Sequence, residues 1–177
     1  NGGVVYFDPS TFRLNTYKPP VYLTDFQISY RSVEVAQKGS PLKKRIGFID
    51  KVYLNHRQNM LTFNYVGLNF ISPRKNQYEY MLEGLDDNWN EVGNRREATY
   101  TNLSPGKYTF RVRATNNDGL LNEKGASVDI IISPPWWKRW WFKIIIFLSI
   151  LTAVVRIIRT RESATRRDKE ILRQKIE

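Results

Sequence analysis

Residues 144–155 read IIIFLSILTAVV, twelve positions without a charge, and no other stretch of the chain constrains its fold as strongly. As a helix this run is about 18 Å long, shorter than the hydrocarbon core of a bilayer at about 30 Å. A helix from Trp140 to Ile158 spans about 28 Å, which is enough when Lys143 and Arg156 extend their charged ends toward the two interfaces. Residues 136–158 are therefore predicted to form a transmembrane helix with a Trp-rich start.

The residues around the apolar run predict its orientation. Four indoles precede it at the level of the lipid headgroups, where such rings are favoured: Trp136, Trp137, Trp140 and Trp141. Residues 136–177 carry 11 Lys and Arg against 4 Asp and Glu, and residues 1–135 carry 17 against 13, so most of the net charge of +11 lies in the last quarter. Because basic residues concentrate on the cytoplasmic side, we expect residues 1–135 outside the cytoplasm and the C-terminus inside it.

The alternative for this segment is a buried core helix. It is less favourable, because a core helix is seldom apolar on every face. Beyond the run, Ile157, Ala164 and Ile171 recur every seven residues, with Ile158 and Leu172 beside them. This spacing is compatible with a parallel two-helix seam, although the complementary core position is occupied by charged residues: Arg161, Asp168 and Lys175.

The stretch from residue 21 to 133 alternates apolar and polar positions, which indicates β-strands with one buried face. The clearest strands are MLTFNYV at 60–66, QYEYMLEG at 77–84, GKYTFRVRAT at 106–115 and ASVDIIIS at 126–133. Turn sequences such as Ser-Pro, Pro-Gly and Asn-Asp-Gly separate the strands. We therefore predict an all-β fold over residues 18–135, an antiparallel sandwich of the immunoglobulin or fibronectin-III type.

The segment LSPGKY at 103–108 resembles the tyrosine corner of such sandwiches, in which a phenol hydroxyl bonds back to the backbone. Tyr108 is the expected corner residue, and Leu103 and Pro105 are expected to shape the turn. The other aromatic candidates are predicted to pack in the core and not to form a glycan platform: Tyr80, Trp89 and Tyr100.

Residues 1–17 do not continue the sandwich pattern. GGVVYFDP at 2–9 reads as a Gly-Gly turn, a short strand and an Asp-Pro turn, which is typical of the end of a preceding β unit. Lys18-Pro19-Pro20 would be a stiff spacer between that unit and the sandwich. The chain opens without Met or a signal peptide, so we expect it to be a fragment of a longer protein.

These segments together resemble one family. GGVVYFDP followed by PPVYLTDFQI at 19–28 resembles the junction between the last blade of a sensor β-propeller and a Y_Y_Y domain, and residues 58–119 are similar to that domain. PPWWKRWWF at 134–142 is similar to the way the domain ends in hybrid two-component sensor histidine kinases of the Bacteroidetes type. Leu121 stands where the resemblance leads us to expect Trp.

The resemblance implies a homodimeric receptor of the inner membrane, with residues 1–135 in the periplasm. Residues 1–17 would end a propeller blade and residues 159–177 would begin a cytoplasmic signalling helix. The signal would be an oligosaccharide held mainly by the missing propellers, relayed by dimer rearrangement to a kinase beyond Glu177. This segment itself would have no catalytic, cofactor or metal residues and no nucleic-acid partner.

The residues offer few other sites. The chain has no cysteine, and its single histidine, His56, lies in a polar turn. Asp86-Asp87-Asn88 is read as a turn in preference to a calcium site, and Glu83 with Asp86 or Asp87 lacks the pattern of a glycosidase pair. The basic runs are read as solvated loops: Lys43-Lys44-Arg45 and Arg95-Arg96.

Three other function classes compete with a receptor relay. A membrane-tethered carbohydrate-binding or adhesion module would share the same extracytoplasmic half, and so would a receptor with a cyclic-dinucleotide synthase as output. A nucleic-acid binder is suggested by the isoelectric point of about 9.9. It is disfavoured because the positive charge flanks an apolar run and does not alternate with stacking aromatics on a strand face.

Overall fold

The computed structural model of the protein describes residues 14–174, with side chains defined as far as Arg159. The chain divides into two compact units, the first ending at Ser133 and the second beginning at Pro134. The expected end of a propeller blade lies mostly in residues 1–13, outside the described residues. The side chains of the expected seam beyond Arg159 also lie outside them.

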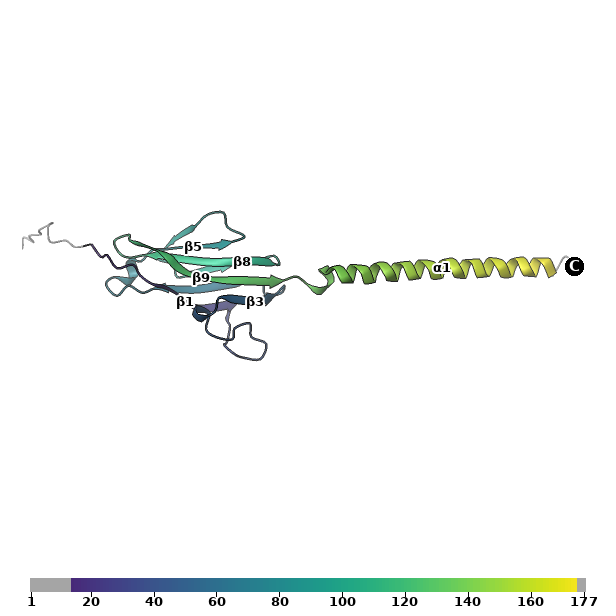
Figure 1. The fold of residues 1–177 in the computed structure, drawn as a ribbon, viewed down its shortest axis with the longest axis horizontal. Helices are drawn as coiled ribbons and strands as arrows, with labels where there is room; N and C mark the ends of the chain where they lie inside the picture. Colours follow the sequence, from purple (N-terminus) through teal and green to yellow (C-terminus); the bar gives the residue numbers. More distant parts are fainter. Residues whose placement is uncertain (1–13, 175–177) are drawn as a thin grey trace, which may run out of the picture. The chain divides into compact units, whose positions relative to one another are not determined.

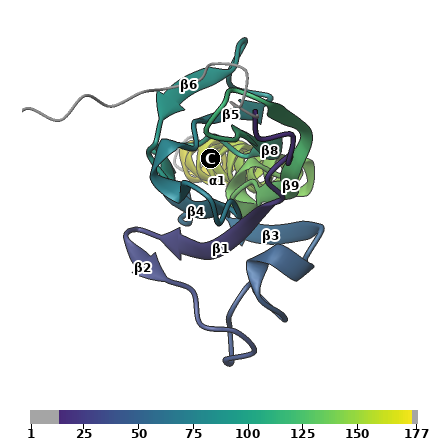
Figure 2. The same cartoon turned by 90° about the vertical axis from the view of Figure 1, so that its left-hand side faces the viewer.

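The first unit is a β-sandwich, as the alternation predicted (Figure 1). One sheet has four strands in the order β2-β1-β4-β7, and the other has five in the order β3-β9-β8-β5-β6 (Figure 2, viewed along the strands). The bounds are β1 Val21–Ile28, β2 Arg31–Ser32, β3 Lys51–Asn55, β4 Leu61–Gly67, β5 Tyr78–Glu83, β6 Asn90–Gly93, β7 Glu97–Tyr100, β8 Gly106–Thr115 and β9 Leu121–Ser133. Short 3-10 turns interrupt the connections at η2 Ile46–Phe48 and η3 Pro73–Lys75.

One strand pair departs from the predicted antiparallel arrangement. β3 runs parallel to β9, from Lys51 opposite Asp129 to Asn55 opposite Ser133. A parallel pair needs a long connection, and here the connection from β3 to β9 contains β4 to β8. Residues 33–50 form the crossover between β2 and β3, which carries the chain from the edge of one sheet to the edge of the other. Leu42 on this crossover is buried and anchors it to the core.

The core is formed by the apolar faces of both sheets. Phe63 of β4 stacks on Phe110 of β8, with ring centroids 4.1 Å apart and planes at 6°, and Phe26 of β1 lies 5.3 Å from Phe63. In β8 every second residue from Tyr108 to Ala114 is buried. The apolar faces that the period-two pattern predicted therefore meet between the sheets.

A β-bulge interrupts the β8–β9 pairing between Val112 and Ala114. Gly125 lies in the bulge at φ +54°, and a Cβ atom built there would be only 2.0 Å from the carbonyl oxygen of Val112. The backbones approach so closely that only glycine fits.

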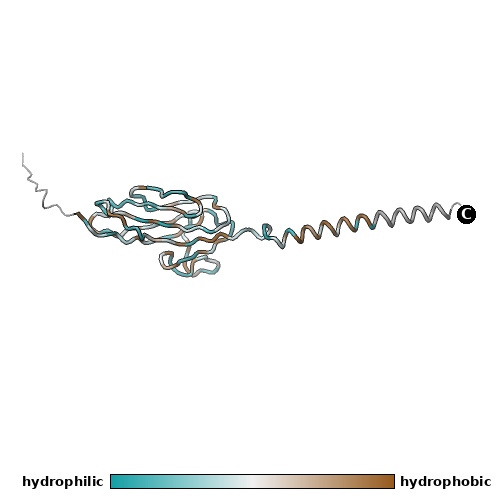
Figure 3. Tube along the Cα trace, turned by 45° about the horizontal axis from the view of Figure 1, so that its top comes forward, coloured by the Kyte–Doolittle hydropathy of each residue, from teal (hydrophilic) through white to brown (hydrophobic). Residues whose placement is uncertain are grey.

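The second unit contains a short turn, η4 Trp136–Lys138, and one long helix, α1 Trp140–Gln174. The span Trp140–Arg159 is long and apolar enough to cross a membrane, and none of its apolar window is buried within the protein. Figure 3 shows the hydrophobic residues along this part of the helix. The span differs by one residue from the predicted Trp140–Ile158.

We predict that Gly125→Ala destabilises the sandwich by roughly 2 kcal/mol more than Gly93→Ala does. Gly93 is the matched control, because its φ is +61° and nothing lies within 4 Å of its added Cβ. The destabilisation caused by Gly93→Ala therefore measures only the cost of a left-handed backbone conformation for alanine, about 1–2 kcal/mol. Urea unfolding of the detergent-solubilised chain, followed by circular dichroism, measures both. Equal destabilisation by the two variants would contradict the close approach.

Candidate functional site

Residues 14–20, which lead into the sandwich, are fixed to the turn between β8 and β9. The buried side chain of Asn116 donates through Nδ2 to the carbonyl oxygens of Asn15, at 2.5 Å, and Tyr17, at 2.9 Å. Its Oδ1 accepts from the backbone N–H groups of Asp118 and Leu120, both at 2.9 Å. One amide therefore joins the incoming segment to the turn and holds the turn itself.

Further contacts strengthen this attachment, which we call the linker clamp and define as Asn15, Asn116, Asn117, Asp118 and Asn122. The Asn15 N–H donates to Asp118 Oδ2 at 2.6 Å, and its side chain donates to Asn117 Oδ1 at 2.8 Å. At the first residues of β9, Asn122 Nδ2 donates to the Pro19 carbonyl at 2.9 Å. The incoming segment is thus bonded directly to the strand that leaves the sandwich.

Strand β9 connects the linker clamp to the second unit. It contains 13 residues and so extends over about 43 Å. Its last five residues pair with β3 on one side, and β8 pairs with it on the other. After Ser133 the chain continues through Pro134 and Pro135, which have restricted backbone freedom and no N–H donor.

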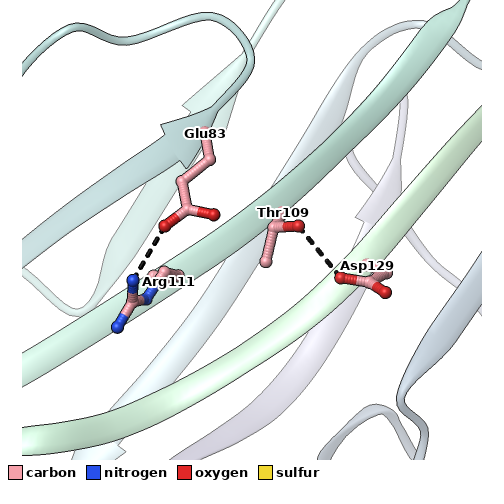
Figure 4. Close-up of polar contacts among 4 residues, drawn as sticks. All are labelled: Glu83, Thr109, Arg111 and Asp129. Carbon is pink, nitrogen blue, oxygen red and sulfur yellow. Dashed lines mark hydrogen bonds and ion pairs between the residues drawn. The ribbon is translucent and has the colours of Figure 1, made fainter.

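The outer face of the five-stranded sheet carries paired charges. Arg111 bonds Glu83 at 2.8 Å, and Thr109 donates to Asp129 at 2.9 Å (Figure 4). Arg113 pairs with Glu79 at 2.6 Å. These contacts join β5, β8 and β9 across the sheet on the side away from the core.

Trp89, which we expected in the core, lies half-buried on this outer face. The guanidinium carbon of Arg113 is 4.0 Å from its ring centroid, and that of Arg111 is 5.7 Å away. The guanidinium groups of the two arginines make cation–π contacts with the face of the indole, and the aliphatic stems of arginine side chains suit an apolar surface of this kind. It therefore stabilises the outer face instead of filling the core.

The expected corner residues lie together at the start of β8. The Tyr108 hydroxyl donates to the Ser104 carbonyl at 2.9 Å. Leu103 is buried, and its N–H donates to the Asn59 carbonyl at 2.9 Å. Pro105 is exposed at the turn.

A cluster of phenols fills one part of the sandwich. Tyr80 lies edge-on to Tyr100, with centroids 5.9 Å apart, and packs against the core from its rim. Burial raises the pKa of Tyr65, and the neighbouring phenols of Tyr80 and Tyr78 raise it further. Burial also raises the pKa of Tyr100, as does its 2.6 Å hydrogen bond to the carboxylate of Asp86. Tyr65 and Tyr100 therefore stay neutral at physiological pH and act in packing.

The residues considered as metal or catalytic candidates have structural contacts. The Asp86 carboxylate also accepts from the Leu82 N–H at 2.8 Å and from the Asn90 side chain at 3.1 Å, so it organises the turn after β5. Within residues 14–159, no group of three or more His, Asp or Glu side chains could hold a metal ion. His56 lies in the turn between β3 and β4, where the Gln58 N–H bonds the Asn55 carbonyl.

The tryptophans expected at the membrane interface lie on both sides of a break at Arg139. Trp136 and Trp137 belong to η4, and the Trp136 ring packs edge-on against Phe142 of α1 with centroids 4.9 Å apart. The other members of the expected interface set are exposed on the helix: Trp140, Trp141, Lys143 and Arg156.

Residues 69–133 match the Y_Y_Y domain family. The chain carries a Y_Y_Y domain. The match covers β5 to β9, including the β8–β9 turn of the linker clamp and the whole of the strand that leaves the sandwich, whereas the sandwich itself begins at Val21. The family resemblance of this region is therefore confirmed.

Histidine kinase P4 of Formosa agariphila is 34% identical to this chain over 175 residues, which is 99% of the chain and 13% of the relative. The extracellular domain of BT4673 from B. thetaiotaomicron has been described both as a one component system and as a hybrid two component system. Its two crystal structures match with TM-scores of 0.61 and 0.58, at 29% identity, over 69% of this chain and 16% of that one. The Y_Y_Y domain thus resembles the extracellular part of signalling receptors, and with α1 this indicates a membrane protein with an extracellular domain.

We predict that Asn116→Asp detaches residues 14–20 from the sandwich. The carboxylate keeps both acceptor contacts within the turn but cannot donate to the Asn15 and Tyr17 carbonyls. We expect a loss of about 2 kcal/mol in stability. Hydrogen exchange of the amides in residues 14–20 should accelerate at least about tenfold, since about 1.4 kcal/mol corresponds to a factor of ten.

The matched control is Asn102→Asp. Asn102 is exposed, and its side-chain oxygen accepts from Asn59, a role that a carboxylate retains. The same change of charge there should leave exchange in residues 14–20 unaltered. Equal exchange in both variants would show that the Asn116 amide does not hold the incoming segment.

Proposed function

We propose that this chain is the signal-relay segment of a membrane receptor kinase, which couples extracellular sensing to a cytoplasmic histidine kinase. The observation that carries the proposal is the course of β9. At its first residues Asn122 bonds the incoming segment, and after its last residue the chain passes through two prolines, the short turn η4 and Arg139 before the helix α1 begins at Trp140. A displacement applied to residues 14–20 is therefore applied to the strand that precedes the membrane helix in the chain.

The stiffness of the sandwich supports transmission over adhesion. β9 is hydrogen-bonded to β8 along most of its length and to β3 over its last five residues. The charged contacts of the outer face add cross-links between β5, β8 and β9. A tethered adhesion module needs no such continuous connection from its incoming segment to its anchor.

The finer features of the proposal rest on the family resemblance and the charge pattern. In the proposed receptor, residues 1–135 are periplasmic, α1 crosses the inner membrane, and two copies rearrange as a homodimer when an oligosaccharide binds to domains that precede this chain. The excess of basic residues after Val155 supports the orientation. A histidine kinase beyond Glu177 would be the output.

We predict that four glycines inserted between Ser133 and Pro134 uncouple sensing from output in the complete receptor. Such a linker behaves as a flexible coil and relaxes a displacement of β9 before it reaches α1. Induction of a target-gene reporter by a panel of oligosaccharides should fall at least about tenfold, with receptor abundance and membrane insertion unchanged.

The control carries the same four glycines between Lys38 and Gly39, two exposed residues on the crossover between β2 and β3. This variant should respond as the unaltered receptor does. A full response from the Ser133 insertion would contradict transmission through β9. The absence of any response from the unaltered protein would favour the alternative function, a membrane-tethered carbohydrate-binding or adhesion module.

We predict that alkaline phosphatase fused after Glu177 is inactive in cells, because the basic end of α1 stays in the cytoplasm, where this enzyme does not mature. The same enzyme inserted between Lys38 and Gly39 should be active. Fractionation should recover both fusions with the membranes. Activity of the Glu177 fusion would reverse the proposed orientation.

A further inference from the structure

Two large apolar side chains are exposed next to each other in the loop after β4. Phe70 is 86% exposed and Ile71 is 72% exposed. Neither belongs to the core cluster. Single exposed apolar side chains are common, but two large ones next to each other form a small apolar patch, and such patches are candidate interaction surfaces.

The loop is held in place by a buried amide. Asn69, only 2% exposed, donates through Nδ2 to Asn76 at 2.9 Å and to Asn117 at 3.2 Å, while its Oδ1 accepts from the Ile71 N–H at 3.2 Å. The buried side chain of Asn76 in turn donates to the Gly67 carbonyl at 2.9 Å. The two apolar residues are therefore presented on a fixed support.

The same support holds the incoming segment. Asn117 Oδ1, which accepts from Asn69, also accepts from Asn15. Leu14 and Tyr17 of that segment are themselves 66% and 49% exposed. Exposed apolar side chains thus lie at the end of the sandwich where residues 14–20 enter it.

This end also carries positive charge. A pocket of about 350 Å³ beside Asn117 is lined by Arg74, Lys75, Asn76, Gln77, Gly93 and Asn94. Its lining contains two cations and no carboxylate. A partner that fits this surface has an apolar depression with acidic residues at its rim.

We propose that Phe70 and Ile71 dock into such a depression on the extracellular body that precedes Leu14 in the complete receptor. That body is the favoured occupant because this chain is only 13% of the kinase it resembles, and because the docking loop and the incoming segment share the Asn117 amide. The contact would give the relay a second attachment to its input beside the linker clamp. It depends on the proposed function only in requiring an extracellular body at that position.

Hydroxyl-radical footprinting of the complete, detergent-solubilised receptor tests the proposal. Phe48 on η2 is the internal control, since it has the same side chain and is 78% exposed on a different segment. We expect Phe70 to be oxidised at least fivefold less than Phe48. Equal oxidation would overturn the proposal, and so would protection that disappears when the receptor is diluted until it is monomeric, which would assign the surface to a second copy.

The double variant Phe70→Ser, Ile71→Ser provides a second readout. Both side chains are outside the core, so the melting temperature of the sandwich should stay within about 2 °C. Chymotryptic cleavage after Tyr17 should accelerate at least fivefold in the complete receptor, whereas Phe48→Ser should not change it. Unchanged cleavage in the double variant would overturn the proposal. Neither readout uses kinase activity, so failure of the relay and failure of this contact are separate outcomes.

Discussion

The Asn116 side chain satisfies four backbone groups at once, and the connection between the incoming segment and the rest of the sandwich depends on it. Its two donors and its acceptor oxygen are all used, and the group is buried. A buried amide that is fully paired fixes one arrangement, because any other would leave carbonyls or N–H groups without partners. The position of residues 14–20 against the β8–β9 turn is set by this requirement.

The same turn leads into β9, so one strand connects the linker clamp with the end of the sandwich from which the chain leaves. The core contributes stiffness through the stacked Phe63 and Phe110 rings, and the outer face through Arg113, Glu79 and Trp89. Both faces of the five-stranded sheet are therefore cross-linked, one by packing and one by charge. A displacement of β9 would therefore cause little deformation within the sheet.

The sequence predicted the sandwich and the membrane helix well, because the sandwich follows from two-residue alternation and the helix from a long apolar run without charges. The parallel pairing of β3 was missed, because nothing in the sequence KVYLN indicates which strand it pairs with. The pairing depends on the path of residues 33–50, which bring β3 to the edge of the second sheet. Trp89 was expected in the core together with Tyr80 and Tyr100. The signal against this was present in β8, where Arg111 and Arg113 alternate outward and offer an indole a surface to pack on.

The clamp residues were also missed, because asparagine is common in turns and its type does not say whether a particular amide is buried and paired. Asn117 was read only as part of an Asn-Asp-Gly turn and Asn116 was not singled out, yet both residues hold a segment about 100 positions earlier in the chain. Long-range polar contacts of this kind depend on which loops meet, and the periodicity of a single sequence does not contain that information.

The parallel alignment of β3 beside the end of β9 affects how the domain responds to force. A pull along β9 toward the membrane would strain its hydrogen bonds to β3 and β8 in shear, so that several must break together instead of opening one after another. Rupture under tension would then be slow, and the sandwich would remain folded under a load directed along β9.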